Sequence, residues 1–268
     1  MSFRSLHHEL LEYEGKNTFV DVLVPWLENN PEEIEWLKSI RKVSGESIPK
    51  MSEDDLWSLY AVSRVTELLV LPFQEGRADG SDWPGPLISE DELASFSQSI
   101  GLEVIRPEKY SPFHHEIVEL TCSPDPAQGP KVTKHHWPCL MLGPLLLMRA
   151  GAAVSAGSSI MHPEIAASST LYWAYRRKNR PHQDLADGWG SNSSWRTDFR
   201  RDYHVGDTFH FNVDGEVDLS TLPAETRNEG GLDPDERIEL LVNRCFITVP
   251  KEHTDQYPYG DRFSMKVN

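Results

Sequence analysis

One segment of the sequence, residues 172–204, combines cationic and aromatic side chains at high density. It holds seven Lys or Arg residues against four Asp, a local charge of +3 in a chain whose formal net charge is −16. A guanidinium group offers a planar fork of N–H donors that fits carboxylate or phosphate oxygens, and a neighbouring aromatic ring can stack on a flat molecule. We therefore expect this segment to bind a small anionic or planar substrate. The expected contacts are Tyr175, Arg176, Trp189, Asn192, Trp195, Arg196, Arg200 and Arg201.

The same segment contains a glycine-rich loop, Gly-Trp-Gly-Ser-Asn-Ser-Ser at 188–194, which could bring backbone N–H groups close to a ligand. The loop does not match the G-x-G-x-x-G or Walker patterns of nucleotide-binding proteins. A purely structural interpretation is also open. Arg196, Asp198, Arg200 and Asp202 alternate along the chain, so on a strand they would share one face and form ion pairs with neighbouring strands.

A second group of residues has the spacing of a metal site. His114 and Glu116 lie in a stretch that alternates like a strand, so both side chains would lie on one face. Together with His210 from a later strand they could form a two-histidine, one-carboxylate site for a divalent transition metal. His114 and Glu116 could also act as catalytic acid and base groups. Because the chain has 11 histidines, such pairs also arise by chance, and structural histidines are the competing interpretation.

The sequence lacks the motifs of several other enzyme classes. It has no G-x-S-x-G, no H-E-x-x-H, and no P-C-x-x-C after the H-x-E at His114. Its three cysteines, Cys122, Cys139 and Cys245, form no C-x-x-C pair, so neither a structural zinc site nor a disulfide framework is expected. We expect a cytoplasmic protein, with no signal peptide in the acidic N-terminal residues and no apolar run long enough to cross a membrane.

Start signals and hydrophobic patterns predict the elements that would position these residues. Ser52, Ser89 and Asp233 each precede acidic first turns, and they predict helices over 53–71, from 90 onward and over 234–242. Alternating stretches predict strands at 102–105, 115–120, 195–204, 208–213, 217–219 and 246–249. The apolar run after Gly143 predicts a buried helix at 144–150, and Pro163 begins a further predicted helix over 163–177.

These elements predict an α+β fold, in which a helical N-terminal third packs on a mostly antiparallel β region with inserted helices. The length of 268 residues fits a single globular domain, 1–268. The glycine- and proline-rich stretch at 76–86 allows a subdivision into a helical region over residues 1–75 and a sheet-containing region over residues 87–268.

Two functions from different classes agree with these observations. The first is a soluble cytoplasmic enzyme that acts on a small anionic or planar substrate and could use a divalent transition metal as cofactor, by a reaction that the sequence does not specify. The second is an acidic, non-catalytic binding or inhibitor protein that docks a basic protein partner, because the charge of −16 would attract a cationic surface. The same charge opposes non-specific binding to nucleic acid and to anionic membranes.

Overall fold

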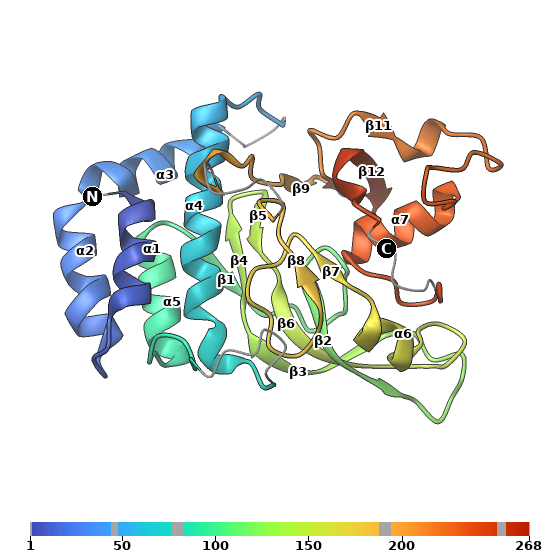
Figure 1. Ribbon diagram of the computed structural model, residues 1–268, viewed down its shortest axis with the longest axis horizontal. Helices are drawn as coiled ribbons and strands as arrows, with labels where there is room; N and C mark the ends of the chain where they lie inside the picture. Colours follow the sequence, from blue (N-terminus) through green and yellow to red (C-terminus); the bar gives the residue numbers. More distant parts are fainter. Residues whose placement is uncertain (1, 44–47, 77–82, 188–193, 251–255, 268) are drawn as a thin grey trace.

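The computed structural model describes residues 2–43, 48–76, 83–187, 194–250 and 256–267. The N-terminal third is helical, and its helices stand side by side at one end of the molecule (Figure 1). These helices are α1 (Phe3–Glu12), α2 (Val24–Asn29), α3 (Pro31–Val43), α4 (Glu53–Leu69) and α5 (Glu90–Ser99). The two later helices, α6 (Pro163–Ser168) and α7 (Pro234–Asn243), are inserted in the sheet-containing region.

The three helix starts predicted from capping residues are confirmed. Ser52 caps α4 by accepting a hydrogen bond from the Asp55 N–H, and Ser89 forms a capping box with Glu92 at the start of α5. Asp233 begins α7 with the same kind of capping box. Helix α4 ends at Leu69, two residues before its predicted end, because the chain turns there into a short 3-10 helix, Leu71–Phe73.

Three sheets form the rest of the fold. The largest is antiparallel except for its last pair and has the order β1 (Glu103–Ile105), β4 (Cys139–Leu142), β5 (Leu145–Met148), β9 (Asp202–Val205), β10 (Thr208–Phe211), β12 (Asp261–Lys266) and β11 (Val217–Asp218). The second has the order β2 (His115–Cys122), β6 (Ala150–Ala156) and β3 (Lys131–Trp137), and β2 runs parallel to β6. The third pairs β7 (Leu171–Tyr172) with β8 (His182–Gln183).

The prediction of a buried helix at 144–150 is wrong. Residues Leu145–Met148 form strand β5, which pairs with β4 on one side and with β9 on the other. All four of its side chains are buried, and a strand covered on both faces has a continuous apolar sequence that periodicity cannot distinguish from a buried helix. Gly143, at φ +60°, makes the turn between β4 and β5.

Three other predicted elements differ from the structure. Helix α6 ends at Ser168 instead of reaching 177, and Ser168 Oγ donates to the Glu164 carbonyl, a local bond that competes with helix continuation. The strand predicted at 195–204 is a 3-10 turn, Ser194–Arg196, and an irregular stretch before β9 begins at Asp202. Residues 246–249 form no strand, and the C-terminal strand is β12.

The core joins the helices to the sheets. One cluster of buried side chains unites α1, α3 and α4 with β4, β5 and β9, as Leu6, Leu37, Val65, Leu145 and Tyr203 illustrate. A second cluster packs Leu240 and Leu241 of α7 against Phe209 and Phe211 of β10. These contacts confirm the α+β class, with N-terminal helices packed on mostly antiparallel sheet. Among the described residues, no helix is long and apolar enough to span a bilayer.

Candidate functional site

A pocket lies between α4 and the chain that leads from β7 to β9. Its cavity volume is about 30 Å³, and the empty space around it, including the part open to solvent, totals about 440 Å³. We call it the arginine pocket, because three of its lining residues are arginines that are largely buried. The lining residues are Tyr60, Ser63, Arg64, Glu67, Leu147, Trp173, Tyr175, Asp184, Leu185, Asp198, Phe199, Arg200 and Arg244.

One wall of the pocket belongs to a buried group of three arginines around a single carboxylate, which we call the arginine cluster. Asp202, in β9, is fully buried and accepts a hydrogen bond from Arg200 Nε at 2.8 Å and one from Arg244 Nη2 at 3.2 Å. Arg149, between β5 and β6, approaches the same carboxylate to 3.8 Å. Three positive charges therefore surround one negative charge in the interior.

The arginine cluster also has a structural role at the end of α7. Arg200 Nη2 donates to the Leu241 carbonyl at 3.0 Å, and Arg149 Nη2 donates to the Val242 carbonyl at 2.9 Å. The carbonyl groups of a last helical turn have no partner within the helix and carry partial negative charge, so they favour nearby cations. Some of the cluster's charge thus stabilises this helix terminus.

The protein does not use all of the donors in the arginine cluster. Arg149 Nε and Nη1, Arg200 Nη1 and Arg244 Nε are buried and have no hydrogen-bond partner among the described residues. Burial and the neighbouring Arg244 lower the pKa of Arg200 to about 10, although Asp202 opposes this shift. Burial lowers the pKa of Arg149 further, with repulsion from Arg244 and Arg200 adding to it. Since arginine keeps its proton in proteins, the lowered pKa values indicate that the cluster would be stabilised by a further anion.

The opposite wall of the arginine pocket comes from α4. Arg64 lies over the Tyr175 ring, 3.5 Å from its centroid, and its Nε donates to Tyr60 Oη at 2.6 Å. Tyr60 Oη in turn donates to Asp184 Oδ1 at 2.5 Å. Burial raises the pKa of Asp184 despite the nearby Arg64, and burial and Asp184 raise the pKa of Tyr60. Tyr60 and Asp184 therefore form a hydrogen-bonded pair that could hold or release a proton beside a ligand.

The pocket also has flat surfaces and unusual backbone geometry. The Arg200 guanidinium lies over the Trp173 ring, 4.0 Å from its centroid, an arrangement typical of cation–π contacts. Trp173 and Arg244 adopt the left-handed conformation, with φ values of +52° and +62°. Side-chain-bearing residues rarely take this conformation, and such residues concentrate at binding and catalytic sites.

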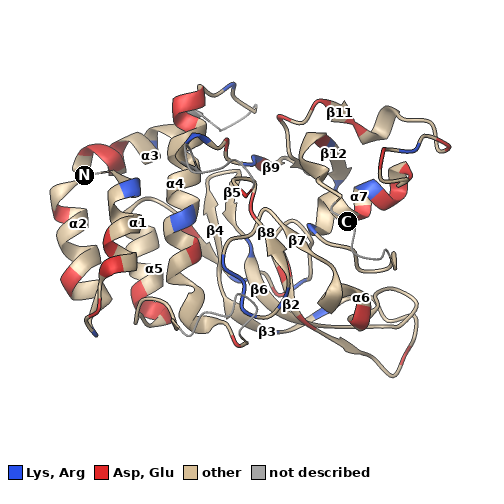
Figure 2. Ribbon diagram, in the orientation of Figure 1, with Lys and Arg blue, Asp and Glu red and all other residues tan. Residues whose placement is uncertain are grey.

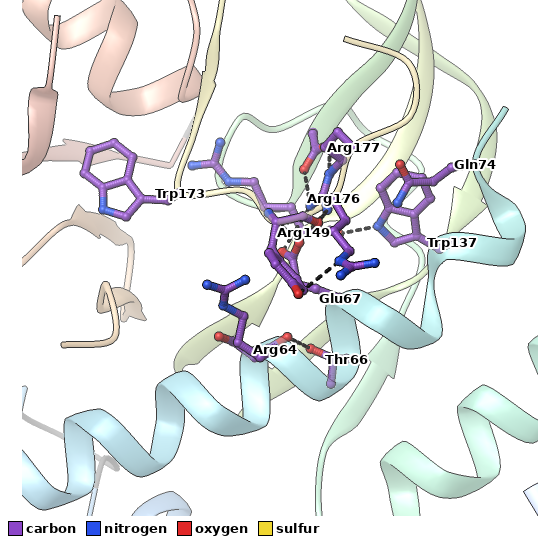
Figure 3. Close-up of polar contacts among 12 residues, drawn as sticks. Arg64, Thr66, Glu67, Gln74, Trp137, Arg149, Trp173, Arg176 and Arg177 are labelled. Carbon is purple, nitrogen blue, oxygen red and sulfur yellow. Dashed lines mark hydrogen bonds and ion pairs between the residues drawn. The ribbon is translucent and has the colours of Figure 1, made fainter. Parts of the chain in front are cut away.

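Behind the pocket, Arg177 joins two buried glutamates. Its guanidinium donates to both Glu116 oxygens, at 2.7 and 2.9 Å, and also pairs with Glu67 of α4 (Figure 3). Burial alone would raise the pKa of Glu116, but Arg177 lowers it, so this carboxylate is held as an anion. Glu67 also accepts from the Tyr175 N–H at 3.0 Å, so this ion-pair group fixes one edge of the pocket.

The predicted metal site of His114, Glu116 and His210 is wrong as an arrangement, because the three side chains do not converge. Glu116 is occupied by Arg177, and the His114 ring lies against Phe113 and Phe209. His210, in another sheet, contacts Ser264 Oγ at 2.8 Å. Within the described ranges, no three or more His, Cys, Asp or Glu side chains are grouped to hold a metal ion. Neither His114 nor Glu116 lines the arginine pocket, so the geometry offers them no catalytic role there.

In the structure, two of the predicted substrate contacts line the arginine pocket, and the other described ones lie elsewhere. Tyr175 and Arg200 line the arginine pocket. Trp195 packs against His7, and exposed Arg196 lies 5.7 Å from the Trp57 ring.

The other predicted contacts lie elsewhere. Arg176 Nε donates to Tyr175 Oη, and Arg201 binds Asp214 and the Pro49 carbonyl instead of a ligand. Trp189 and Asn192 fall outside the described residues. The predicted ladder of Arg196, Asp198, Arg200 and Asp202 on one strand face does not form, because β9 begins only at Asp202. Among the described residues, Arg200 pairs with Asp202, and Asp202 also pairs with Arg149 and Arg244.

Several residues that complete the pocket and the arginine cluster were not predicted from the sequence. Arg64 and Glu67 lie within the mostly buried helix α4, and Arg149 follows the apolar strand β5 directly. Arg244 follows α7 as its C-cap. The sequence signal that could have identified them is a charged residue inside or directly beside an apolar run. Such a residue is normally buried only where it is paired with an opposite charge or takes part in function.

Comparison of the chain with protein-family models, with curated proteins and with solved structures found no match. The function of the chain is therefore inferred from the geometry of the site alone.

Proposed function

We propose that this protein is a cytoplasmic enzyme that binds a small, flat anion in the arginine pocket. The observation that carries the proposal is the set of buried N–H groups on Arg200 and Arg244 that have no hydrogen-bond partner among the described residues. Both arginines line the pocket. A buried donor without a partner is costly, so a ligand oxygen that accepts from it gains most of that free energy on binding. Trp173 and Tyr175 supply apolar surface for a planar ligand body.

Tyr60 and Asp184 are the groups that we assign to proton exchange with the bound anion. Both line the pocket and are joined by a 2.5 Å hydrogen bond. Burial raises the pKa of Asp184, which brings this carboxyl group closer to the range in which it could exchange a proton.

Isothermal titration calorimetry with benzoate, phenyl sulfate and phenyl phosphate tests the binding step. We expect at least one of these aryl anions to bind to the wild-type protein. Replacing Arg200 by Lys keeps the charge but removes the bidentate fork, so affinity should fall about tenfold to a hundredfold, as expected for a lost hydrogen bond to a charged group. The matched control is Arg106→Lys, at an exposed pair with Glu90 outside the pocket, and it should leave affinity unchanged.

The same titration distinguishes the alternatives. If Arg200→Lys lowers thermal stability and no aryl anion binds to the wild-type protein, the arginine cluster is only a structural ion-pair network. Recovery of a stoichiometric, salt-sensitive protein partner without any ligand binding would instead favour the acidic binding or inhibitor protein. The acidic residues at the starts of helices α3, α4 and α5 are the groups that such a partner would meet (Figure 2).

A further inference from the structure

The charge of the arginine cluster restricts the ligand that can fill the pocket. Arg149, Arg200 and Arg244 carry three positive charges, and Asp202 supplies the one carboxylate among them. The side chains of Arg149, Arg200 and Asp202 are at most 2% exposed, so water screens their repulsion poorly. The two carbonyl groups at the end of α7 offset only a fraction of the formal excess of two charges.

Among the described residues, the charged groups on the other elements around the pocket do not cancel this excess locally. On α4, Arg64 pairs with Asp184, so these two residues are balanced. Glu67 is shared with Arg177, which also holds Glu116. The remaining acid of the lining, Asp198, is exposed. None of the lining residues that the structure describes is a histidine, so no imidazole among them changes charge between pH 5 and 8.

We propose that the arginine pocket selects a dianionic, tetrahedral head group of the phosphate-monoester class over monoanions. This inference rests on the proposed binding of a small anion in the same pocket. A dianion would neutralise the excess of two charges, whereas a sulfate ester or a carboxylate would leave one unit unbalanced. A phosphoryl group also presents three terminal oxygens, which suit donors that approach from two different guanidinium groups.

Arg200 and Arg244 approach the pocket from different elements, which favours a tetrahedral group over a planar one. Arg200 lies just before β9 and Arg244 is the C-cap of α7, and each retains an unused N–H after binding Asp202. A phosphoryl group offers three terminal oxygens that point in different directions, whereas a carboxylate offers two oxygens in a single plane. The organic portion of the ligand would then rest on Trp173 and Tyr175, which line the same pocket.

Two aryl anions of the same shape provide the test. Phenyl phosphate and phenyl sulfate share a ring and a tetrahedral head group, but phosphate monoesters gain a second negative charge above about pH 6, whereas sulfate esters stay monoanionic. Calorimetry of the wild-type protein at constant ionic strength should show phenyl phosphate binding about tenfold more tightly, or better, at about pH 8. At about pH 5 the two affinities should differ by less than about threefold, because both ligands are then monoanions.

The result separates this inference from the proposed function. If phenyl sulfate or benzoate binds as tightly as phenyl phosphate at about pH 8, selection for a dianion is overturned while anion binding stands. If none of the three ligands binds, both proposals fail.

A variant with one positive charge fewer in the arginine cluster provides a second test of the charge argument. Arg244→Gln removes one unit of the excess, so it should reduce the preference for phenyl phosphate over phenyl sulfate at least about threefold. The control Arg227→Gln, at a half-exposed ion pair with Asp233, should retain the full preference. An unchanged preference in folded Arg244→Gln, as judged by its circular dichroism, would count against the charge argument.

Discussion

Arg177 is the residue on which two buried carboxylates depend. Its side chain is 1% exposed and pairs with Glu67 and Glu116, whose side chains are 10% and 2% exposed. Breaking a buried ion pair from one side leaves uncompensated charge, which typically costs about 3 to 5 kcal/mol. We expect Arg177→Met to lower the free energy of unfolding by about that amount in urea denaturation. Arg106→Met, at an exposed pair, should change it by less than about 1 kcal/mol. A small change in Arg177→Met would mean that the glutamates share a proton instead.

His7 gives the protein an acid sensitivity of its own. Its ring is buried between α1 and Trp195, and neither ring nitrogen has a partner among the described residues. Burial, with help from Arg64, lowers its pKa to about 3 from an ordinary value near 6.5. The unfolded chain therefore binds a proton at this site that the folded protein does not, so stability falls as the pH drops from about 6.5 toward 3.

The corresponding experiment compares wild type with His7→Phe, which keeps an aromatic ring at the site. Between about pH 7.5 and about pH 4.5 the wild-type protein should lose about 2.7 kcal/mol through His7, and the variant should lose that much less. Urea titrations at the two pH values measure the difference. His8→Phe serves as the control because that neighbouring side chain is exposed. Identical pH profiles for wild type and His7→Phe would show that the folded protein protonates His7 normally.

At the scale of helices and strands, local capping signals predicted correctly where helices begin. The apolar run at 144–150, in contrast, was assigned to a helix although it forms a strand. Ser52, Ser89 and Asp233 act through bonds to residues three positions away, so the sequence contains everything that those caps need. Strand β5 depends on β4 and β9, and β9 lies more than 50 residues further along the chain. Its apolar sequence is equally compatible with a buried helix, so only the tertiary pairing decides.

The candidate site shows the same difference between local sequence signals and contacts that join distant segments. Composition singles out residues 172–204, and two of their predicted contacts, Tyr175 and Arg200, do line the pocket. Arg64 and Arg244 come from distant helices, so no pattern within one segment contains them. The metal prediction was wrong for a related reason. Period-two alternation places side chains on a face, but it does not say that a partner such as Arg177 already occupies that face.

At the scale of the whole molecule, the pocket joins the two regions into which the sequence could be divided. Tyr60, Arg64 and Glu67 belong to the helical region, residues 1–75, whereas Arg200 and Arg244 belong to the sheet-containing region, residues 87–268. The pair of Arg177 with Glu67 and the core cluster of helices with β4, β5 and β9 cross the same boundary. Neither region can therefore be removed without exposing apolar surface and leaving buried charges unpaired.

This arrangement predicts that the two regions unfold together. Urea denaturation followed by far-ultraviolet circular dichroism, which is dominated by the helices, should have the same midpoint as denaturation followed by the fluorescence of the eight tryptophans. An aryl anion that binds in the pocket should raise both midpoints equally, by about 2.7 kcal/mol at a hundred times its dissociation constant. Two separate transitions, or a ligand shift in only one of them, would instead support two independent domains, because a ligand stabilises only the folding unit that its binding site requires.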